Sequence, residues 1–191
     1  MNKTAITAAP ILPVLAERWS PRSYDTTHEV SQHDLTSILE AARWAPSANN
    51  GQPWRFSVAV RGSELHAKVA AGLGGFNGSW APSASALIVV SILKTHADGS
   101  AYQSAPYDAG LAVANLTIQA QELGLHTHQM MGIEHATIHQ NLGLDENLAV
   151  LLVVSVGTVA PAEQLAGPAY EREIQPRVRH SLDDIVLHGK P

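Results

Sequence analysis

Two long apolar runs limit the folds open to this chain more than any other feature of its sequence. They are ALIVVSIL at residues 86–93 and LAVLLVVSV at residues 148–156, both rich in β-branched side chains. Successive side chains of a strand point to opposite faces of its sheet, so a strand that is apolar at nearly every position is buried on both faces. We therefore expect two central strands of a sheet that is covered by helices on each side, which is an α+β fold.

The spacing of apolar residues, together with capping and helix-ending residues, predicts the elements around these strands. Ser31 begins a Ser-x-x-Asp cap and Pro46 cannot continue a helix, so a helix is expected over residues 31–45. A helix over residues 108–123 is apolar nearly all round, and we expect it to be shared between the core and a partner subunit. The other expected elements are strands at 54–60 and 125–131 and helices at 64–71 and 134–142.

Composition narrows the class of protein further. The chain shows no repeat, low-complexity tract or linker, so residues 1–191 are expected to form a single domain. Only 15% of its residues are charged, against roughly 25% in typical soluble domains. This shortage of charge favours an extensive buried contact between subunits, because obligate interfaces resemble a domain core cut in half. The formal net charge of −5 argues against a nucleic-acid partner, and the absence of cysteine excludes disulfides, zinc–thiolate sites and thiol nucleophiles.

The sequence carries no recognisable secretion or membrane signal. Pro10 and Pro13 interrupt the apolar start MNKTAITAAPILPVL, which makes it a poor signal peptide. The two long apolar runs are far shorter than the ~20 residues that span a bilayer. We therefore expect a cytoplasmic protein with no membrane partner.

Several familiar catalytic motifs are incomplete. The glycine-rich segment 72–78 has Asn77 where a dinucleotide-binding fingerprint needs a glycine, and no strand precedes it, so a flexible turn is expected there. The chain has no Gly-x-Ser-x-Gly elbow for serine hydrolysis. His135 and His139 are four residues apart but lack the glutamate of a zinc-protease helix. Hydrogen-bonded histidines are therefore favoured over the metal site of a hydrolase, and no metal is expected.

Basic residues are unevenly distributed along the chain. No Lys or Arg occurs between residues 95 and 171. Two segments outside that range, Arg18-Trp-Ser20-Pro-Arg22 and Arg177-Val-Arg179, place arginines at alternate positions, on one side of an extended chain. The planar guanidinium suits phosphate oxygens, and the Ser20 hydroxyl adds a donor. The two segments are either parts of one phosphate site or surface arginines in ion pairs, and the spacing alone leaves both interpretations open.

The loop between the first helix and the first strand is rich in amides. It reads APSANNGQPW over residues 45–54, with prolines that restrict its shape and Asn and Gln side chains that suit the edge of a heterocycle. Together with the two arginine segments, this loop resembles the FMN-dependent nitroreductase family. Matching segments follow in the family's order along nearly the whole chain: RWSPRSY, AARWAPSANNGQPWRF, AAGLGGFN, DAGLAVANLTIQAQELGLHTHQMMGI, LAVLLVVSVG and RVRHSLDDIV.

The resemblance implies a nitroreductase-like mixed β-sheet flanked by helices, in an intertwined homodimer with FMN at the subunit interface. Arg22 would lie near the pyrimidine edge of the flavin. The implied phosphate contacts are Arg18, Ser20, Arg177 and Arg179. The other implied contacts within the same chain are Trp19, Asn77, Met131 and Gly132. The partner chain would contribute Pro46, Ser47, Ala48 and Asn50.

The same resemblance implies hydride transfer from NAD(P)H through the flavin to a nitroaromatic, quinone or similar small-molecule acceptor, in ping-pong turnover. No catalytic side chain is expected, because the reactive group belongs to the cofactor. Trp19 and Trp80 stand where family members often have cations, which predicts weaker charge stabilisation of the reduced flavin. The alternatives are a specialised flavin dehydrogenase, a reductive dehalogenase, a catalytically weak flavin-binding protein and a histidine-based metal hydrolase.

Overall fold

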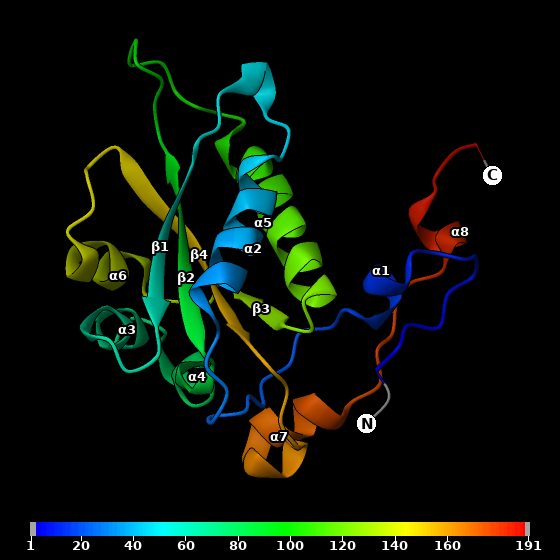
Figure 1. Cartoon of the computed structure of the whole chain (residues 1–191). Helices are drawn as coiled ribbons and strands as arrows, with labels where there is room; N and C mark the ends of the chain where they lie inside the picture. Colours follow the sequence, from blue (N-terminus) through cyan, green and yellow to red (C-terminus); the bar gives the residue numbers. More distant parts are fainter. Residues whose placement is uncertain (1–2, 190–191) are drawn as a thin grey trace.

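A four-stranded sheet forms the centre of the protein. The computed structural model describes residues 3–189 (Figure 1). Its strands are β1 (Trp54–Val60), β2 (Ala86–Leu93), β3 (His126–Met130) and β4 (Leu148–Gly157), in the spatial order β1-β2-β4-β3. All four predicted strands are confirmed, with ends that differ from the expected ones by at most one residue.

Every strand pairing among residues 3–189 is antiparallel, so the expectation of a mixed sheet is wrong. β1 runs in the same direction as β4, and β2 in the same direction as β3. In the order β1-β2-β4-β3, however, a strand of opposite direction lies between the members of each pair. Strands of like direction are therefore present but are never neighbours.

Helices cover both faces of the sheet, as the two apolar runs predict. The helices α2 (Gln32–Arg43) and α5 (Ala105–Glu122) pack on one face, in a hydrophobic cluster with Ile88 and Val90 (Figure 1). The opposite face is covered by α3 (Glu64–Ala70), α4 (Gly75–Gly78) and α6 (His135–Leu142), in a cluster with Leu87 and Val89. These four β2 side chains are fully buried, so β2 has a core on each side. The α+β fold with helices flanking the sheet is confirmed.

The helix boundaries follow the predicted capping signals only in part. Ser31 caps α2, because its Oγ accepts a hydrogen bond from the backbone N–H of Asp34 at 3.0 Å. α5 begins three residues before the expected Asp108, with Pro106 in its first turn, where a helix has no use for the missing N–H. The segment 72–78 is not a simple flexible turn, since it contains the single helical turn α4.

α5 is buried on one face only. Ala109, Val113 and Leu116 lie in the core, whereas the side chain of Tyr107 is 71% exposed. Within one chain, α5 is therefore buried on its core face alone, and the predicted contact of its second face with a partner subunit stays a prediction. Its apolar residues on the second face lie at the surface of the described chain.

The two ends of the chain form terminal arms, residues 3–17 and 175–189, which extend away from the sheet (Figure 1). The arms contain α1 (Pro13–Glu17) and α8 (Leu182–Ile185), and α7 (Gly167–Ile174) leads into the second arm. Arg177 joins the arms, because its Nη1 donates to the backbone carbonyls of Lys3 and Ala16 at 2.6 and 2.7 Å.

Three 3-10 turns complete the described elements: η1 (Ala48–Asn50), η2 (Ala81–Ser83) and η3 (Ala162–Gln164). Within residues 3–189, none of the helices combines the length and the apolar composition needed to traverse a bilayer.

Candidate functional site

The two arginine segments, which are more than 150 residues apart in the chain, meet around one pocket of about 230 Å³. We call it the cationic pocket. Six of its lining side chains are basic and one is a carboxylate. The segments therefore come together as the phosphate interpretation requires. The lining residues are Lys3, Arg18, Trp19, Ser20, Arg22, Arg172, Glu173, Gln175, Pro176, Arg177 and Arg179.

The cations of this pocket repel one another. The pKa of Arg18 is lowered, first by burial and then by the charges of Arg177 and Arg179. The pKa of Arg177 is lowered by burial and by Arg179. Such shifts mean that the charged forms lack sufficient compensation from water or from negative groups in the protein. An anion in the pocket would supply that compensation.

Arg18 and Arg179 each make one hydrogen bond among those described for residues 3–189. Arg18 Nη1 donates to Ser20 Oγ at 3.3 Å, so the guanidinium and the hydroxyl lie together as expected. Arg179 Nη1 donates to the adjacent carbonyl of Val178 at 2.8 Å. Arg177 differs, because its Nη1 joins the terminal arms through two carbonyls. Arg18 and Arg179 therefore retain most of their donors for a ligand, while Arg177 has a structural role as well.

Glu173 of α7 holds the backbone of the first arginine segment, and the sequence analysis missed it. Its side chain is 2% exposed, its Oε2 accepts the N–H of Arg22 at 2.8 Å, and its Oε1 accepts the N–H of Ser23 at 3.2 Å. The Nη1 of Arg22 lies 3.9 Å from Oε2. Burial raises the pKa of Glu173, and the hydrogen bonds from Ser23 and Arg22 oppose that rise. Nothing in the local sequence distinguishes this glutamate from its charged neighbours.

Two aromatic rings lie against the guanidinium of Arg22. Its Cζ lies 5.8 Å from the ring centroid of Trp80 and 5.9 Å from that of Phe76. Trp80 is 2% exposed and contacts the ring of His128, with 4.6 Å between centroids and an angle of 40° between the ring planes. It therefore supports Arg22 from the core, and does not line the pocket itself.

His128 fixes the same segment from the sheet. Its Nδ1 lies 2.9 Å from the carbonyl oxygen of Pro21. Burial lowers the pKa of His128 to about 4, and Arg22 and Arg18 add to that effect. The ring is thus neutral at pH 7 and donates its Nδ1–H to the carbonyl, without adding a further cation to the pocket.

Two of the predicted ring contacts are joined by a hydrogen bond. Asn77 Nδ2 donates to the carbonyl of Gly132 at 2.9 Å. Asn77 follows Phe76 in α4, and the ring of Phe76 contacts Arg22. The side chain of Met131 is 63% exposed. The structure therefore brings Asn77, Met131 and Gly132 together.

The predicted contacts Pro46, Ser47, Ala48 and Asn50 lie elsewhere. They belong to the segment 46–52, which we call the amide loop and which contains η1, at the opposite end of α2 and α5 from the cationic pocket (Figure 1). Asn49, Asn50 and Gln52 adopt φ values of 51°, 55° and 49°, a region that non-glycine residues occupy at a cost of about 1–3 kcal/mol each. A loop that maintains such a conformation must be held by its surroundings.

Asp108 provides much of that support, and the sequence analysis missed its role. It lies in the first turn of α5 and is 2% exposed. The N–H of Ala48 lies 3.3 Å from both of its carboxylate oxygens, and Ser104 Oγ donates to Oδ2 at 3.0 Å. Within the loop, the N–H of Gln52 donates to Ser47 Oγ at 3.1 Å. The amide loop is therefore tied to the helix behind it.

The histidine motif that suggested a metal takes part in other contacts. His135 Nδ1 lies 2.9 Å from the carbonyl of Val150, and its Nε2 lies 3.2 Å from that of Met131. His139 Nε2 lies 3.2 Å from the carbonyl of Asp145. Among residues 3–189, no three His, Asp or Glu side chains are grouped as a metal ion would require.

The α+β fold and the two-ended cationic pocket define a class of protein that comparison with known families identifies. The nitroreductase family profile matches residues 15–73 and 73–158. The chain belongs to the nitroreductase family and is thus a nitroreductase-type oxidoreductase.

Individual relatives agree with this assignment. The chain is 33% identical over 151 residues to an Archaeoglobus fulgidus protein named as an NADH dehydrogenase or NAD(P)H nitroreductase, covering 76% of this chain and 83% of that protein. It is 36% identical over 130 residues to an oxygen-insensitive NADPH nitroreductase of Helicobacter pylori, covering 66% of this chain and 61% of that protein.

Solved structures extend the comparison over the whole fold. An oxidoreductase containing FMN superposes with a TM-score of 0.90 at 34% identity, covering 97% of this chain and 95% of the other. A nitroreductase-like protein of Desulfovibrio desulfuricans, solved in complex with FMN, has a TM-score of 0.77 at 26% identity and covers 96% and 99%.

Proposed function

We propose that this chain binds FMN and transfers hydride from NAD(P)H to a nitroaromatic, quinone or similar small-molecule acceptor by a ping-pong mechanism. The observation that carries the proposal is the meeting of Arg18, Ser20 and Arg179 in one pocket from opposite ends of the chain. FMN in two structural neighbours, and the nitroreductase names of the relatives, support a flavin over other phosphate compounds.

The charged and polar residues present suit FMN. Six basic side chains and one carboxylate line the cationic pocket, which suits a phosphate dianion. At the end of this pocket near α4, the Nε of Arg22 is buried with no hydrogen-bond partner among the described atoms. In α4, Asn77 follows Phe76, whose ring contacts Arg22, and the Asn77 amide donates to the carbonyl of Gly132. The basic side chains suit the phosphate of FMN, and the polar groups near α4 suit the edge of its ring.

When bound, the flavin supplies the group that accepts and then donates hydride. The chain supplies orientation and a fixed positive charge. Arg22, held between Glu173 and two aromatic rings, presents that charge with little freedom to move away. Asn77 fixes the Gly132 carbonyl and so the backbone that would face the ring. No side-chain nucleophile or general acid enters the proposal.

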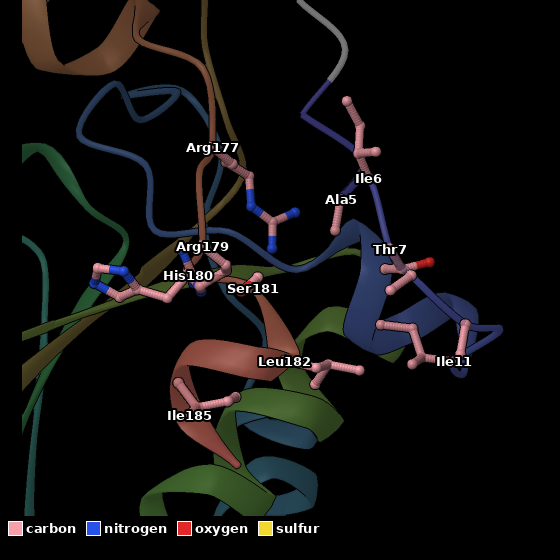
Figure 2. Close-up of a pocket in the computed structure, with 12 residues that line it drawn as sticks. Ala5, Ile6, Thr7, Ile11, Arg177, Arg179, His180, Ser181, Leu182 and Ile185 are labelled. Carbon is pink, nitrogen blue, oxygen red and sulfur yellow. The ribbon is translucent and has the colours of Figure 1, made fainter. Parts of the chain in front are cut away.

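We propose further that the active form is a homodimer in which the amide loop of one subunit covers the flavin held by the other. One subunit alone has the cationic pocket and the amide loop at opposite ends (Figure 1). A cavity of about 580 Å³ between the terminal arms is lined by apolar side chains, among them Ile6, Ile11, Leu182 and Ile185 (Figure 2). Ile6 is fully exposed and Leu182 is 50% exposed. Exposed apolar side chains of this kind are typical of protein contacts, which supports the proposed homodimer.

The reaction is tested by mixing the purified flavin-loaded protein with NADH or NADPH under anaerobic conditions in a stopped-flow instrument. We expect the flavin absorbance to bleach and then to recover when a nitroarene or a quinone is added. A flavin that neither nucleotide bleaches would contradict the reductase and would favour a flavin-binding protein or a dehydrogenase reduced by its own substrate.

The shared site is tested by co-expressing two defective variants. Arg18→Ala/Arg179→Ala removes phosphate contacts, and Asp108→Ala removes the support of the amide loop. If each site takes its two halves from different subunits, the mixed dimer has one site with neither defect and binds flavin that neither parent retains. A mixed dimer that binds no more flavin than its parents would exclude the shared site.

A further inference from the structure

We infer that Glu173 is a positioning residue for the cofactor phosphate, and that it strengthens phosphate binding although it carries a negative charge. The inference rests on the proposed FMN site. It runs against the simplest electrostatic expectation, because a carboxylate beside a phosphate repels it. The backbone contacts of Glu173 give the reason for the opposite sign.

Glu173 acts on the backbone between the phosphate-binding residues and the core. Its two carboxylate oxygens accept separate N–H groups, from Arg22 at 2.8 Å and from Ser23 at 3.2 Å. Those bonds hold the extended segment that begins with Arg18 and Ser20. With the side chain 2% exposed, water cannot take over either bond. The orientation of the Arg18 and Ser20 side chains therefore depends on a carboxylate more than 150 residues away in sequence.

The main chain of Glu173 anchors the other side of the pocket. Lys3 Nζ donates to the carbonyls of Glu173 and Gln175 at 2.7 and 2.5 Å. Two residues beyond Gln175, Arg177 donates back to the carbonyl of Lys3. Residue 173 thus contacts the first arginine segment through its side chain and the first terminal arm through its carbonyl. It lies where the two walls of the cationic pocket are joined.

Glutamine and aspartate separate positioning from charge. Glu173→Gln removes the charge and offers only one oxygen, so its amide NH₂ must face one of the two N–H donors. Glu173→Asp keeps the charge but withdraws the carboxylate by one methylene, out of reach of both donors. A pure charge effect predicts tighter FMN binding for Glu173→Gln and no change for Glu173→Asp. Positioning predicts weaker FMN binding for both.

The experiment measures the dissociation constants of FMN and riboflavin by fluorescence titration. Riboflavin has the same ring without the phosphate. We expect each Glu173 variant to bind FMN at least about tenfold more weakly, from the loss of one or more charge-assisted hydrogen bonds. Riboflavin affinity should fall less, because Glu173 also holds Arg22 at the ring but riboflavin has no phosphate to lose contacts with. Glu171→Gln is the matched control, since Glu171 is an exposed glutamate of the same helix, and it should change neither constant.

Three outcomes would overturn the inference. The first is FMN affinity in Glu173→Gln equal to or tighter than wild type. The second is an equal loss of FMN and riboflavin in both variants, which would indicate general damage to the fold. The third is unaltered FMN binding in Glu173→Asp. Wild-type protein that binds FMN no more tightly than riboflavin would instead contradict the phosphate site itself, and with it the proposed function.

Discussion

The cationic pocket and the amide loop both rely on a buried carboxylate that accepts backbone N–H groups, but the two carboxylates are stabilised differently. Glu173 lies among basic side chains, with Arg22 at 3.9 Å. Asp108 has no ion-pair partner among the described residues. It lies in the first turn of α5, where the helix dipole favours a negative charge, and it accepts the hydroxyl of Ser104.

This difference corresponds to what each region would contact. The cationic pocket concentrates side-chain charge and would bind a phosphate. The amide loop presents Pro46, Ser47, Ala48 and Asn50, none of them charged, and would cover a ring. The one arginine that contacts the loop among the described hydrogen bonds, Arg55, donates to the backbone carbonyl of Gln52 at 3.1 Å and not to Asp108. The contrast teaches that one cofactor can require charge at one end and shape at the other.

The largest expected effect tests the charged region. Arg18→Ala/Arg179→Ala should weaken FMN binding at least about 100-fold, because it removes two sets of charge-assisted hydrogen bonds to one phosphate. Riboflavin binding should change little. Fluorescence titration of both flavins measures the effect, and Arg43→Ala, an exposed arginine paired with Glu40, is the control. Equal losses for both flavins would remove the distinction between the two regions.

The next effect concerns His128, the neutral histidine that contacts the first arginine segment. The pKa of His128 in the folded protein is about 4, below its ordinary value of 6.5. As the pH falls, the unfolded chain therefore takes up a proton at a higher pH than the folded protein does. The stability that the neutral ring contributes above pH 6.5 is lost as the pH falls toward 4, by up to about 3 kcal/mol. Denaturant unfolding at several pH values measures this loss. His128→Gln keeps a donor for the Pro21 carbonyl and should show a shallower loss, whereas an identical pH profile would contradict the assignment.

A smaller effect is expected in the amide loop. Asp108→Ala leaves the N–H of Ala48 without its acceptor and should lower the free energy of unfolding by about 2 kcal/mol. In contrast to the arginine variants, it should weaken FMN and riboflavin binding equally. Denaturant unfolding and paired titrations test both points, with Glu122→Ala at the exposed end of α5 as control. A loss of FMN affinity without a loss of riboflavin affinity would indicate that Asp108 acts on phosphate binding and not on the ring.

The smallest effect tests how tightly the loop packs. A Cβ on Gly51 would lie 1.6 Å from the hydroxyl oxygen of Tyr102, so Gly51→Ala should cost about 1–2 kcal/mol through overpacking. Adding Tyr102→Phe removes that oxygen and should recover part of the loss. A double-mutant cycle by thermal unfolding measures the coupling. Strict additivity of the two changes would show that the loop moves freely at this point.

Sequence patterns were sufficient where one local rule dominates. The apolar runs predict β2 and β4 because burial on both faces leaves no other role for them. The arginine segments were recognised by spacing and by the family's order of motifs. Glu173 could not be predicted, since its role depends on backbone donors near the other end of the chain. The strand order could not be predicted either, because interior strands of either direction have the same apolar pattern.

The hydrogen bonds of Lys3 to the carbonyls of Glu173 and Gln175 span 170 and 172 residues of sequence. Closing so long a loop is slow compared with forming the local turns and helices between its ends. During synthesis, the N-terminal arginines are therefore made long before α7, which carries the carboxylate of Glu173. If the cationic pocket binds a phosphate as proposed, that affinity would arise only as one of the last events of folding.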